Sequence, residues 1–152
     1  MNNDKTKIYQ ATAARPQEAD AADDELQQMR RRMERRQEAM GRMTADLQWL
    51  IGQPSGSLTW TGTQRDLVEM VHLVWMRNAV TDRQGRPCTQ NELARRAFRA
   101  VGRPVPPSLP RIVSRVQNRV TAGLSMVERY ERLAGQGCTI AHFVQHNNPT
   151  QP

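Results

Sequence analysis

The sequence predicts a mainly α protein, in which a winged-helix or helix-turn-helix-like helical domain is preceded by a long, heptad-patterned helix. Apolar residues recur at alternating steps of three and four over residues 22–52, as in an amphipathic or coiled-coil helix. Shorter amphipathic segments follow between residues 57 and 134, and stretches that contain proline and glycine separate them. A chain of 152 residues is long enough for one ordinary domain and an additional arm.

The first part of the chain divides into a tail and a long helix. Residues 1–21 are polar and Ala-rich without apolar periodicity, which predicts a disordered tail. The helix over 22–52 begins with acidic residues and ends at Gly52 and Pro54, and Arg36 interrupts its seam. This seam predicts either a homodimer or packing on the chain's own domain. As a dimer interface it consists of Leu26, Met29, Met33, Met40, Met43, Leu47 and Leu50.

A buried helix is predicted next. Residues 54–57 read as a linker, and the alternating residues 58–61 are typical of one short strand. Residues 62–77 are apolar on most sides of a helix, which indicates a central position in the core. Thr63 and Asp66 have the spacing of a capping box, and His72 is interpreted as a partly buried structural histidine.

Two shorter helices are predicted over 89–101 and 108–120. Thr89 and Glu92 form a T-x-x-E capping box, and Gly102 has the position of a terminating glycine. Residues 103–107 form a stiff loop with three prolines, and Ser108 is a good cap for the second helix. A further helical stretch covers 121–133, which completes a domain over 57–134, and 135–152 is expected to be a flexible tail.

The positive charge of the chain lies in its second part. The net charge is +7; residues 1–57 hold nine basic and nine acidic residues, whereas residues 58–152 hold thirteen arginines and six acids. Such asymmetry indicates a polyanionic partner, with nucleic acid first and an acidic membrane surface second.

Arginines cluster on the two helices 89–101 and 108–120. Each helix has an apolar stripe on one side and arginines on the other, as in a helix-turn-helix protein whose second helix enters the major groove of duplex DNA. Structured RNA is not distinguished from DNA, and a solvated face of an ordinary helical bundle is the alternative. The predicted DNA-binding residues are Arg95, Arg96, Arg99, Arg103, Arg111, Ser114, Arg115, Asn118 and Arg119.

Other chemistry has little support in the sequence. The chain lacks phosphate-binding, dinucleotide-binding, zinc-protease and hydrolase motifs, so we expect no enzyme, no cofactor and no small-molecule substrate. Cys138, His142 and His146 are spaced by four, but this spacing matches no zinc finger, and we expect no metal. No signal peptide and no apolar run of membrane-spanning length is present, which favours a cytoplasmic protein without membrane contact.

A series of short motifs runs through the domain predicted over 57–134. The first are Leu58-Thr59-Trp60-Thr61-Gly62-Thr63 and Leu67-Val68-Glu69-Met70. Further ones are Asn91-Glu92-Leu93-Ala94 with Ala97-Phe98, then Ile112-Val113-Ser114-Arg115 and Asn118-Arg119 with Thr121 and Leu124. In these motifs the chain resembles the RteC family, regulators found on conjugative transposons of Bacteroides and relatives. The resemblance covers about residues 57–134, half of the chain.

The resemblance implies a winged-helix-like DNA-binding domain and control of the excision or transfer genes of a mobile element. It places Arg111, Arg115, Asn118 and Arg119 on or just beyond the recognition helix. The Pro-rich segment 104–110 departs from the family's pattern, and the helix over 22–52 has no counterpart in it.

The sequence thus predicts a DNA-binding transcriptional regulator that dimerises through residues 22–52. The alternative is a coiled-coil adaptor, whose long helix binds another protein and whose basic domain is incidental.

Overall fold

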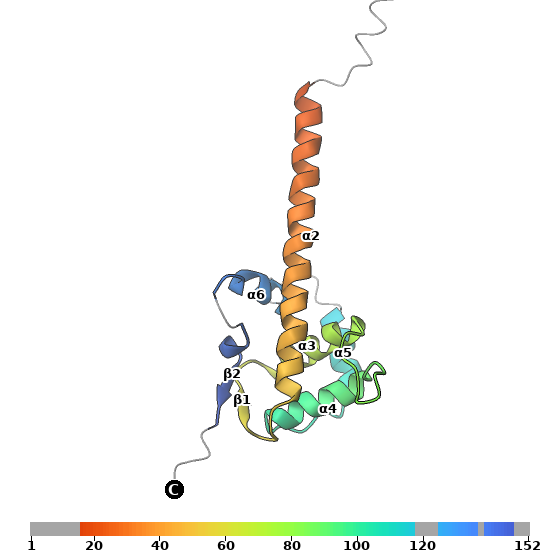
Figure 1. The fold of residues 1–152 in the computed structure, drawn as a ribbon, viewed down its shortest axis with the longest axis vertical. Helices are drawn as coiled ribbons and strands as arrows, with labels where there is room; N and C mark the ends of the chain where they lie inside the picture. Colours follow the sequence, from red (N-terminus) through yellow and green to blue (C-terminus); the bar gives the residue numbers. More distant parts are fainter. Residues whose placement is uncertain (1–15, 118–124, 137–138, 148–152) are drawn as a thin grey trace, which may run out of the picture. The chain divides into compact units, whose positions relative to one another are not determined.

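The structure is a computed structural model that describes residues 16–117, 125–136 and 139–147. It is mainly helical, as predicted. The helices are α2 (Pro16–Ile51), α3 (Gln64–Met76), α4 (Gln90–Ala100), α5 (Leu109–Gln117), α6 (Met126–Leu133) and the short 3₁₀ helix η1 (Thr139–His142), with strands β1 (Leu58–Trp60) and β2 (Val144–His146) (Figure 1). The chain forms two compact units, residues 1–35 and 36–152, which are treated separately below. None of the described helices is long and apolar enough to cross a membrane.

The first unit contains the beginning of α2. Its described residues, 16–35, are all helical and all exposed. The helix therefore begins six residues earlier than the predicted boundary at residue 22, and residues 16–21 are not a tail. Proline is favoured at the first position of a helix, and the alanines at 19, 21 and 22 have the highest helix propensity. The remainder of the predicted tail, residues 1–15, lies outside the described residues.

The end of α2 belongs to the core of the second unit. Met43, Leu47 and Leu50 are fully buried there, and Met40 is partly buried against the same core. The prediction of one continuous dimer seam is therefore wrong for this part of the helix. Leu26, Met29 and Met33, which belong to the first unit, are exposed.

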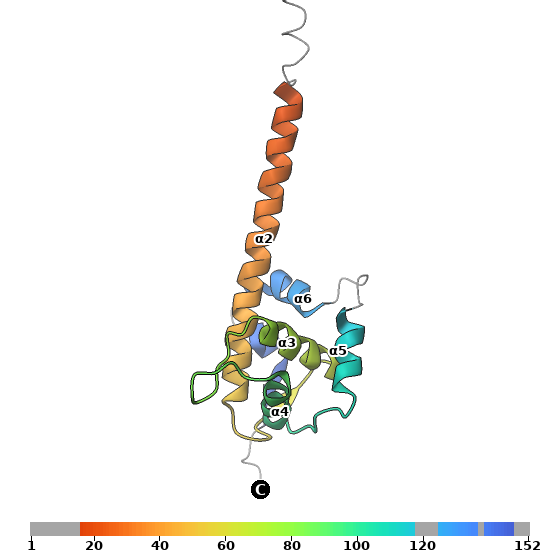
Figure 2. The same cartoon turned by 90° about the vertical axis from the view of Figure 1, so that its right-hand side faces the viewer.

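Helix α3 is the centre of the second unit, as its all-round apolar sequence predicts. Its apolar residues from Leu67 to Val74 are buried apart from the half-buried Leu73. The helix packs against α4, α5 and α6 (Figures 1 and 2). Helix α3 is thus the common contact of these three helices.

The predicted flexible tail over 135–152 is ordered in its described part. Strand β2 pairs antiparallel with β1, so that Trp60 lies opposite Val144, and the predicted strand finds its partner in the C-terminal segment. Phe143 is buried between two aromatic rings, with centroid distances of 5.7 Å to Trp60 and 5.8 Å to Tyr130. Burial of this ring explains why the segment is not loose, since a large aromatic side chain contributes strongly to a core.

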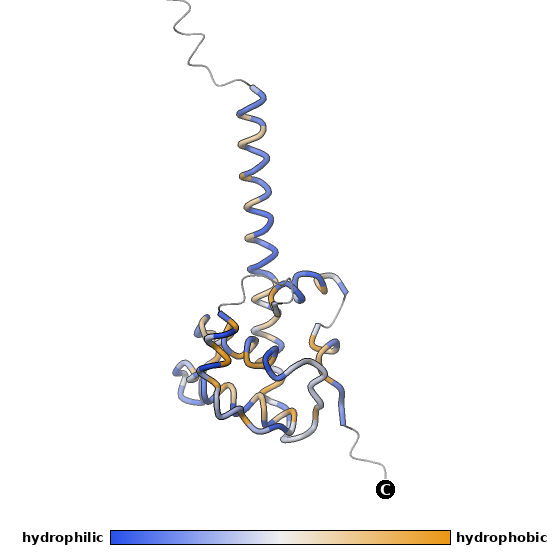
Figure 3. The backbone as a smooth tube through the Cα atoms, turned by 180° about the vertical axis from the view of Figure 1, so that it is seen from behind, coloured by the Kyte–Doolittle hydropathy of each residue, from blue (hydrophilic) through white to orange (hydrophobic). Residues whose placement is uncertain are grey.

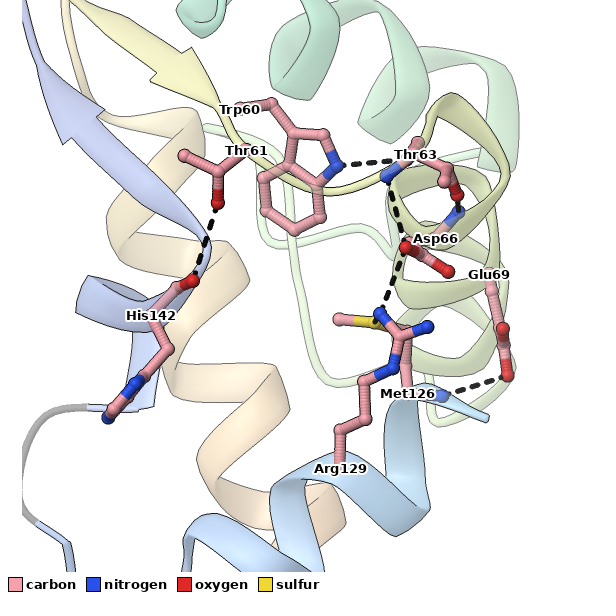
Figure 4. Close-up of polar contacts among 8 residues, drawn as sticks. All are labelled: Trp60, Thr61, Thr63, Asp66, Glu69, Met126, Arg129 and His142. Carbon is pink, nitrogen blue, oxygen red and sulfur yellow. Dashed lines mark hydrogen bonds and ion pairs between the residues drawn. The ribbon is translucent and has the colours of Figure 1, made fainter. Parts of the chain in front are cut away.

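A polar network joins the start of α3 to α6 (Figure 4). The Asp66 carboxylate is buried and accepts hydrogen bonds from the Thr63 backbone N–H at 3.0 Å and from Arg129 Nη1 at 2.9 Å. Thr63 Oγ1 accepts the Asp66 N–H at 3.1 Å in return, which completes the predicted capping box. A buried carboxylate is stable only when it is paired and hydrogen-bonded, and Arg129 and the cap meet that requirement.

Glycine is required at position 62 because the side chains of Trp60 and Asp66 lie close to its backbone. The Trp60 indole Nε1–H donates to the Thr63 carbonyl at 2.9 Å, and this places the ring against the Gly62 backbone. A Cβ at Gly62 would lie 2.9 Å from Trp60 Nε1 and 3.2 Å from Asp66 Oδ2.

We therefore expect Gly62→Ala to lower the free energy of unfolding by about 1–3 kcal/mol, because overpacking displaces the indole and the cap. Gly41→Ala is the matched control, since its Cβ would meet nothing within 4 Å in α2. There we expect a gain of about 0.5–1 kcal/mol from helix propensity. Urea unfolding of both variants measures this difference, and equal stability of the two would contradict the close packing.

Candidate nucleic-acid interface

Helix α4 begins at a Thr89 cap and ends at Gly102. Thr89 Oγ1 accepts the Glu92 N–H at 3.1 Å, but the Glu92 carboxylate accepts from Arg96 Nη2 at 3.0 Å instead of closing the predicted capping box. Gly102 has φ +64°, and the N–H of Arg103 donates to the Phe98 carbonyl, as in a Schellman-type ending. The prediction of Gly102 as the terminating residue is confirmed.

Helix α5 is only lightly buried. It starts where Ser108 accepts two backbone hydrogen bonds, from Arg111 at 3.0 Å and from Ile112 at 3.1 Å. Leu109 is its one fully buried residue among the described ones, while Ile112 and Val113 are half-buried against the core. Most of the surface of α5 therefore faces solvent, as a surface that contacts another molecule must.

His72 connects three helices. This buried side chain of α3 has its Nδ1 3.2 Å from Nε2 of Gln90, the first residue of α4. Its Nε2 lies 3.1 Å from Nε2 of Gln117, the last residue of α5. The sequence predicted a structural histidine without chemistry, and the contacts show which elements it holds.

Four of the predicted arginines are exposed and available. Arg95 and Arg99 project from α4, and Arg111 and Arg115 from α5. None of them takes part in an ion pair within the part of the chain that the structure describes. Their guanidinium groups thus remain free to donate to an external anion, for which their planar fork geometry is well suited.

The remaining predicted DNA-binding residues are not all free and exposed in the way that these four arginines are. Arg96 is paired with Glu92 and only partly exposed, so its charge is largely compensated. Arg103 donates to the Trp60 carbonyl at 3.2 Å and so helps to hold the loop after α4 on β1. Ser114 is exposed on α5. Asn118 and Arg119 lie outside the described residues.

Two grooves flank α5. One, of about 430 Å³, lies between the start of α3 and α5 and is lined by Arg65, Ile112 and Arg115, among others. The other, of about 220 Å³, lies between the start of α4 and α5, with Asn91, Ser114 and Gln117 in its lining. Arg65 was missed by the sequence reasoning, because it stands in the first turn of a helix that the pattern assigned to the core.

A third groove is lined by another arginine that the sequence analysis missed. Arg83, from the turn before α4, lines a groove of about 450 Å³ together with Arg96 and Arg99. Asp82 lines it too, but its carboxylate accepts the backbone N–H groups of Gln84 and Arg86. The hydrogen bond from the Arg86 N–H, foremost among these interactions, lowers the pKa of Asp82.

The structure offers no metal centre in its described part. No three potential metal ligands among His, Cys, Asp and Glu come together in the described residues. His142 and His146 lie exposed in η1 and β2, and Cys138, the third residue of the sequence cluster, lies outside those residues. Cys88 is buried, and this burial raises the pKa of its thiol above its ordinary value.

Comparison of the chain with protein-family models, with curated proteins and with solved structures found no match. The resemblance to the RteC family and the DNA-binding interpretation therefore remain predictions.

The His72 contacts predict a pH-dependent stability. Burial lowers the pKa of His72 from its ordinary value of 6.5, so the folded chain binds a proton less readily than the unfolded chain. The contribution of the neutral His72 ring to the stability of the fold is complete above about pH 6.5 and decreases as the pH falls below that value. We expect the free energy of unfolding, measured by urea unfolding, to decrease as the pH is lowered from 7.5 to 5.5.

His72→Gln removes the titrating ring and should flatten this part of the pH profile. His142→Gln is the control, since His142 is exposed. A profile that His72→Gln leaves as steep as that of the original chain would show that another group is responsible.

Proposed function

We propose that the chain is a non-enzymatic DNA-binding protein that contacts duplex DNA through α4 and α5. The observation that carries this proposal is the set of four exposed, unpaired arginines on these helices: Arg95, Arg99, Arg111 and Arg115. Single-signed charge on two neighbouring elements of one core matches a polyphosphate better than it matches an ordinary solvated face, where opposite charges are mixed.

In this proposal α5 is the helix that reads the major groove. It is amphipathic and lightly buried, and grooves on both sides leave it accessible. Arg111 and Arg115 lie four residues apart, one helical turn, so both reach the same groove, and Ser114 lies between them. Arg95 and Arg99 of α4 would contact the phosphate backbone, which supplies much of the affinity.

The assignment of the domain as winged-helix or helix-turn-helix-like is part of the same proposal. Helices α3, α4 and α5 correspond to the three helices of a helix-turn-helix domain, although the segment between α4 and α5 is longer than the usual turn of three or four residues. The sheet of β1 and β2 is the candidate wing. It departs from a simple winged helix because α6 comes between α5 and β2 in the chain.

The biological role follows from the RteC resemblance. It favours a transcriptional regulator of mobile-element excision or transfer genes. The homodimer rests instead on the heptad pattern of α2, which has no counterpart in that family. Because Met43, Leu47 and Leu50 are buried in the core, self-association would use the exposed residues Leu26, Met29 and Met33 of α2.

The second candidate function is an adaptor that binds another protein through α2, and it is favoured by the exposed residues Leu26, Met29 and Met33. Their exposed fractions of 47%, 59% and 60% are high for large apolar side chains, and a helix of another protein could cover them.

We expect Arg111→Ala and Arg115→Ala each to weaken duplex DNA binding by about 5- to 100-fold. The reason is that a bidentate base contact contributes about 1–3 kcal/mol and a phosphate contact adds to the counterion term. Each lost phosphate contact should also reduce the slope of log K against log salt by about 0.9. Fluorescence anisotropy on fragments selected from random duplex DNA at about 150 mM salt measures both quantities.

Arg132→Ala is the matched control, because Arg132 is an exposed arginine on α6, outside the proposed interface. It should change the affinity by less than about twofold, since at this ionic strength distant exposed charges are screened. Equal losses for all three variants would indicate nonspecific charge attraction. Tighter binding to duplex RNA of the same sequence would point to an RNA-binding protein instead.

A further inference from the structure

The exposed part of α2 carries an apolar stripe that the described chain leaves uncovered. All residues from 16 to 38 are exposed, and Ala39 is the first buried one. Figure 3 shows this part of the helix as hydrophilic with isolated hydrophobic positions. These positions follow steps of three and four, which places them on one side of the helix. The exposed seam consists of Ala19, Ala22, Leu26, Met29, Met33 and Arg36.

The charges of this helix segment are divided between its two ends. Residues 16–25 hold five acidic residues and no basic one, whereas residues 26–36 hold five arginines and one glutamate. The helix dipole accounts only for charges within the first and last turns, and the arginines at 30–36 lie in the middle of α2. The division gives the segment a polarity that a partner of opposite polarity would complement.

A second copy of the chain has that polarity only when it runs in the opposite direction. In a parallel pair each seam residue faces its own copy, so that Arg36 would face Arg36 and the two acidic ends would lie together. In an antiparallel pair the acidic end of one helix lies along the basic end of the other.

One antiparallel register satisfies both the seam and the charges. With Leu26 against Met29 of the other copy, Ala22 faces Met33 and Ala19 faces Arg36, so an alanine lies opposite each of the two outer long side chains. Outside the seam, this register brings Asp23 beside Arg30 of the other copy and Glu25 beside Arg32. Symmetry repeats each pair, so four opposite-charge pairs flank the apolar contacts.

The length of the exposed segment fits the same register. The two-fold axis passes midway between Leu26 and Met29, at the centre of the exposed stretch of residues 16–38. That stretch is about 34 Å long at 1.5 Å per residue. Two copies would thus cover each other's exposed helix over its whole length.

We propose that two copies of the chain associate through an antiparallel pair of the α2 segments 16–38. This inference rests on the homodimer of the proposed function, and it adds the register and the direction. It requires no DNA binding.

Disulfide formation between two single-cysteine variants tests the direction. Ala22→Cys and Met33→Cys are made separately in the full chain, with Cys88→Ala and Cys138→Ser to remove the native thiols. In an equimolar mixture under a glutathione redox buffer, we expect the mixed disulfide between the two variants to predominate. Each variant alone should form little disulfide dimer. Predominance of the two homodimeric disulfides would show a parallel pair and overturn the proposal.

Light scattering of the full chain tests the pairing itself. The original chain should have twice the monomer mass of 17.4 kDa at tens of micromolar concentration, and Met29→Glu should be monomeric. Gln28→Glu introduces the same charge one position away, outside the seam, and should remain dimeric. A monomeric original chain would overturn the pairing. Binding of Met29→Glu to a DNA half-site, with α4 and α5 unchanged, separates that result from a failure of DNA binding.

Discussion

The buried carboxylate of Asp66 joins the start of α3 to α6 at the centre of the second unit. It caps α3 through Thr63 and binds Arg129 of α6, so that one charge fixes both helices. Removing the Arg129 side chain would leave this buried carboxylate without its ion-pair partner, which costs several kcal/mol. The indole of Trp60 packs over this corner and carries the aromatic stack that holds the C-terminal segment.

Helix α3 also supports the proposed interface, because it packs against both α4 and α5. Its buried side carries α4 and α5, and His72 contacts the first residue of one and the last residue of the other. The arginines themselves contribute little to the fold, since Arg95, Arg99, Arg111 and Arg115 have no ion-pair partner among the described residues. A rigid support beneath unpaired charges is the arrangement that preorganises a surface for an anionic ligand.

Local patterns in the sequence predicted the helices, whereas contacts between distant segments were missed. The capping residues Thr63 and Thr89, the end at Gly102 and the burial of α3 depend on neighbours within a few residues. The pairing of β1 with β2 and the burial of Phe143 depend on segments more than eighty residues apart, which periodicity does not encode. The heptad spacing of the apolar residues also could not show which part of α2 is exposed and which part is buried. For the site, the exposed arginines were predictable from helical spacing, but the engagement of Arg103 with Trp60 and the place of Arg65 beside Arg115 required the tertiary structure.

The most direct test of the proposed interface follows the arginine side chains themselves. Nuclear magnetic resonance of the Nε–Hε groups is recorded while a duplex of about 20 base pairs, room for two half-sites, is added at about 150 mM salt. We expect shifts for Arg95, Arg99, Arg111 and Arg115 and unchanged signals for Arg77 and Arg132. Unchanged signals for α5, or shifts confined to Arg77 and Arg132, would contradict it.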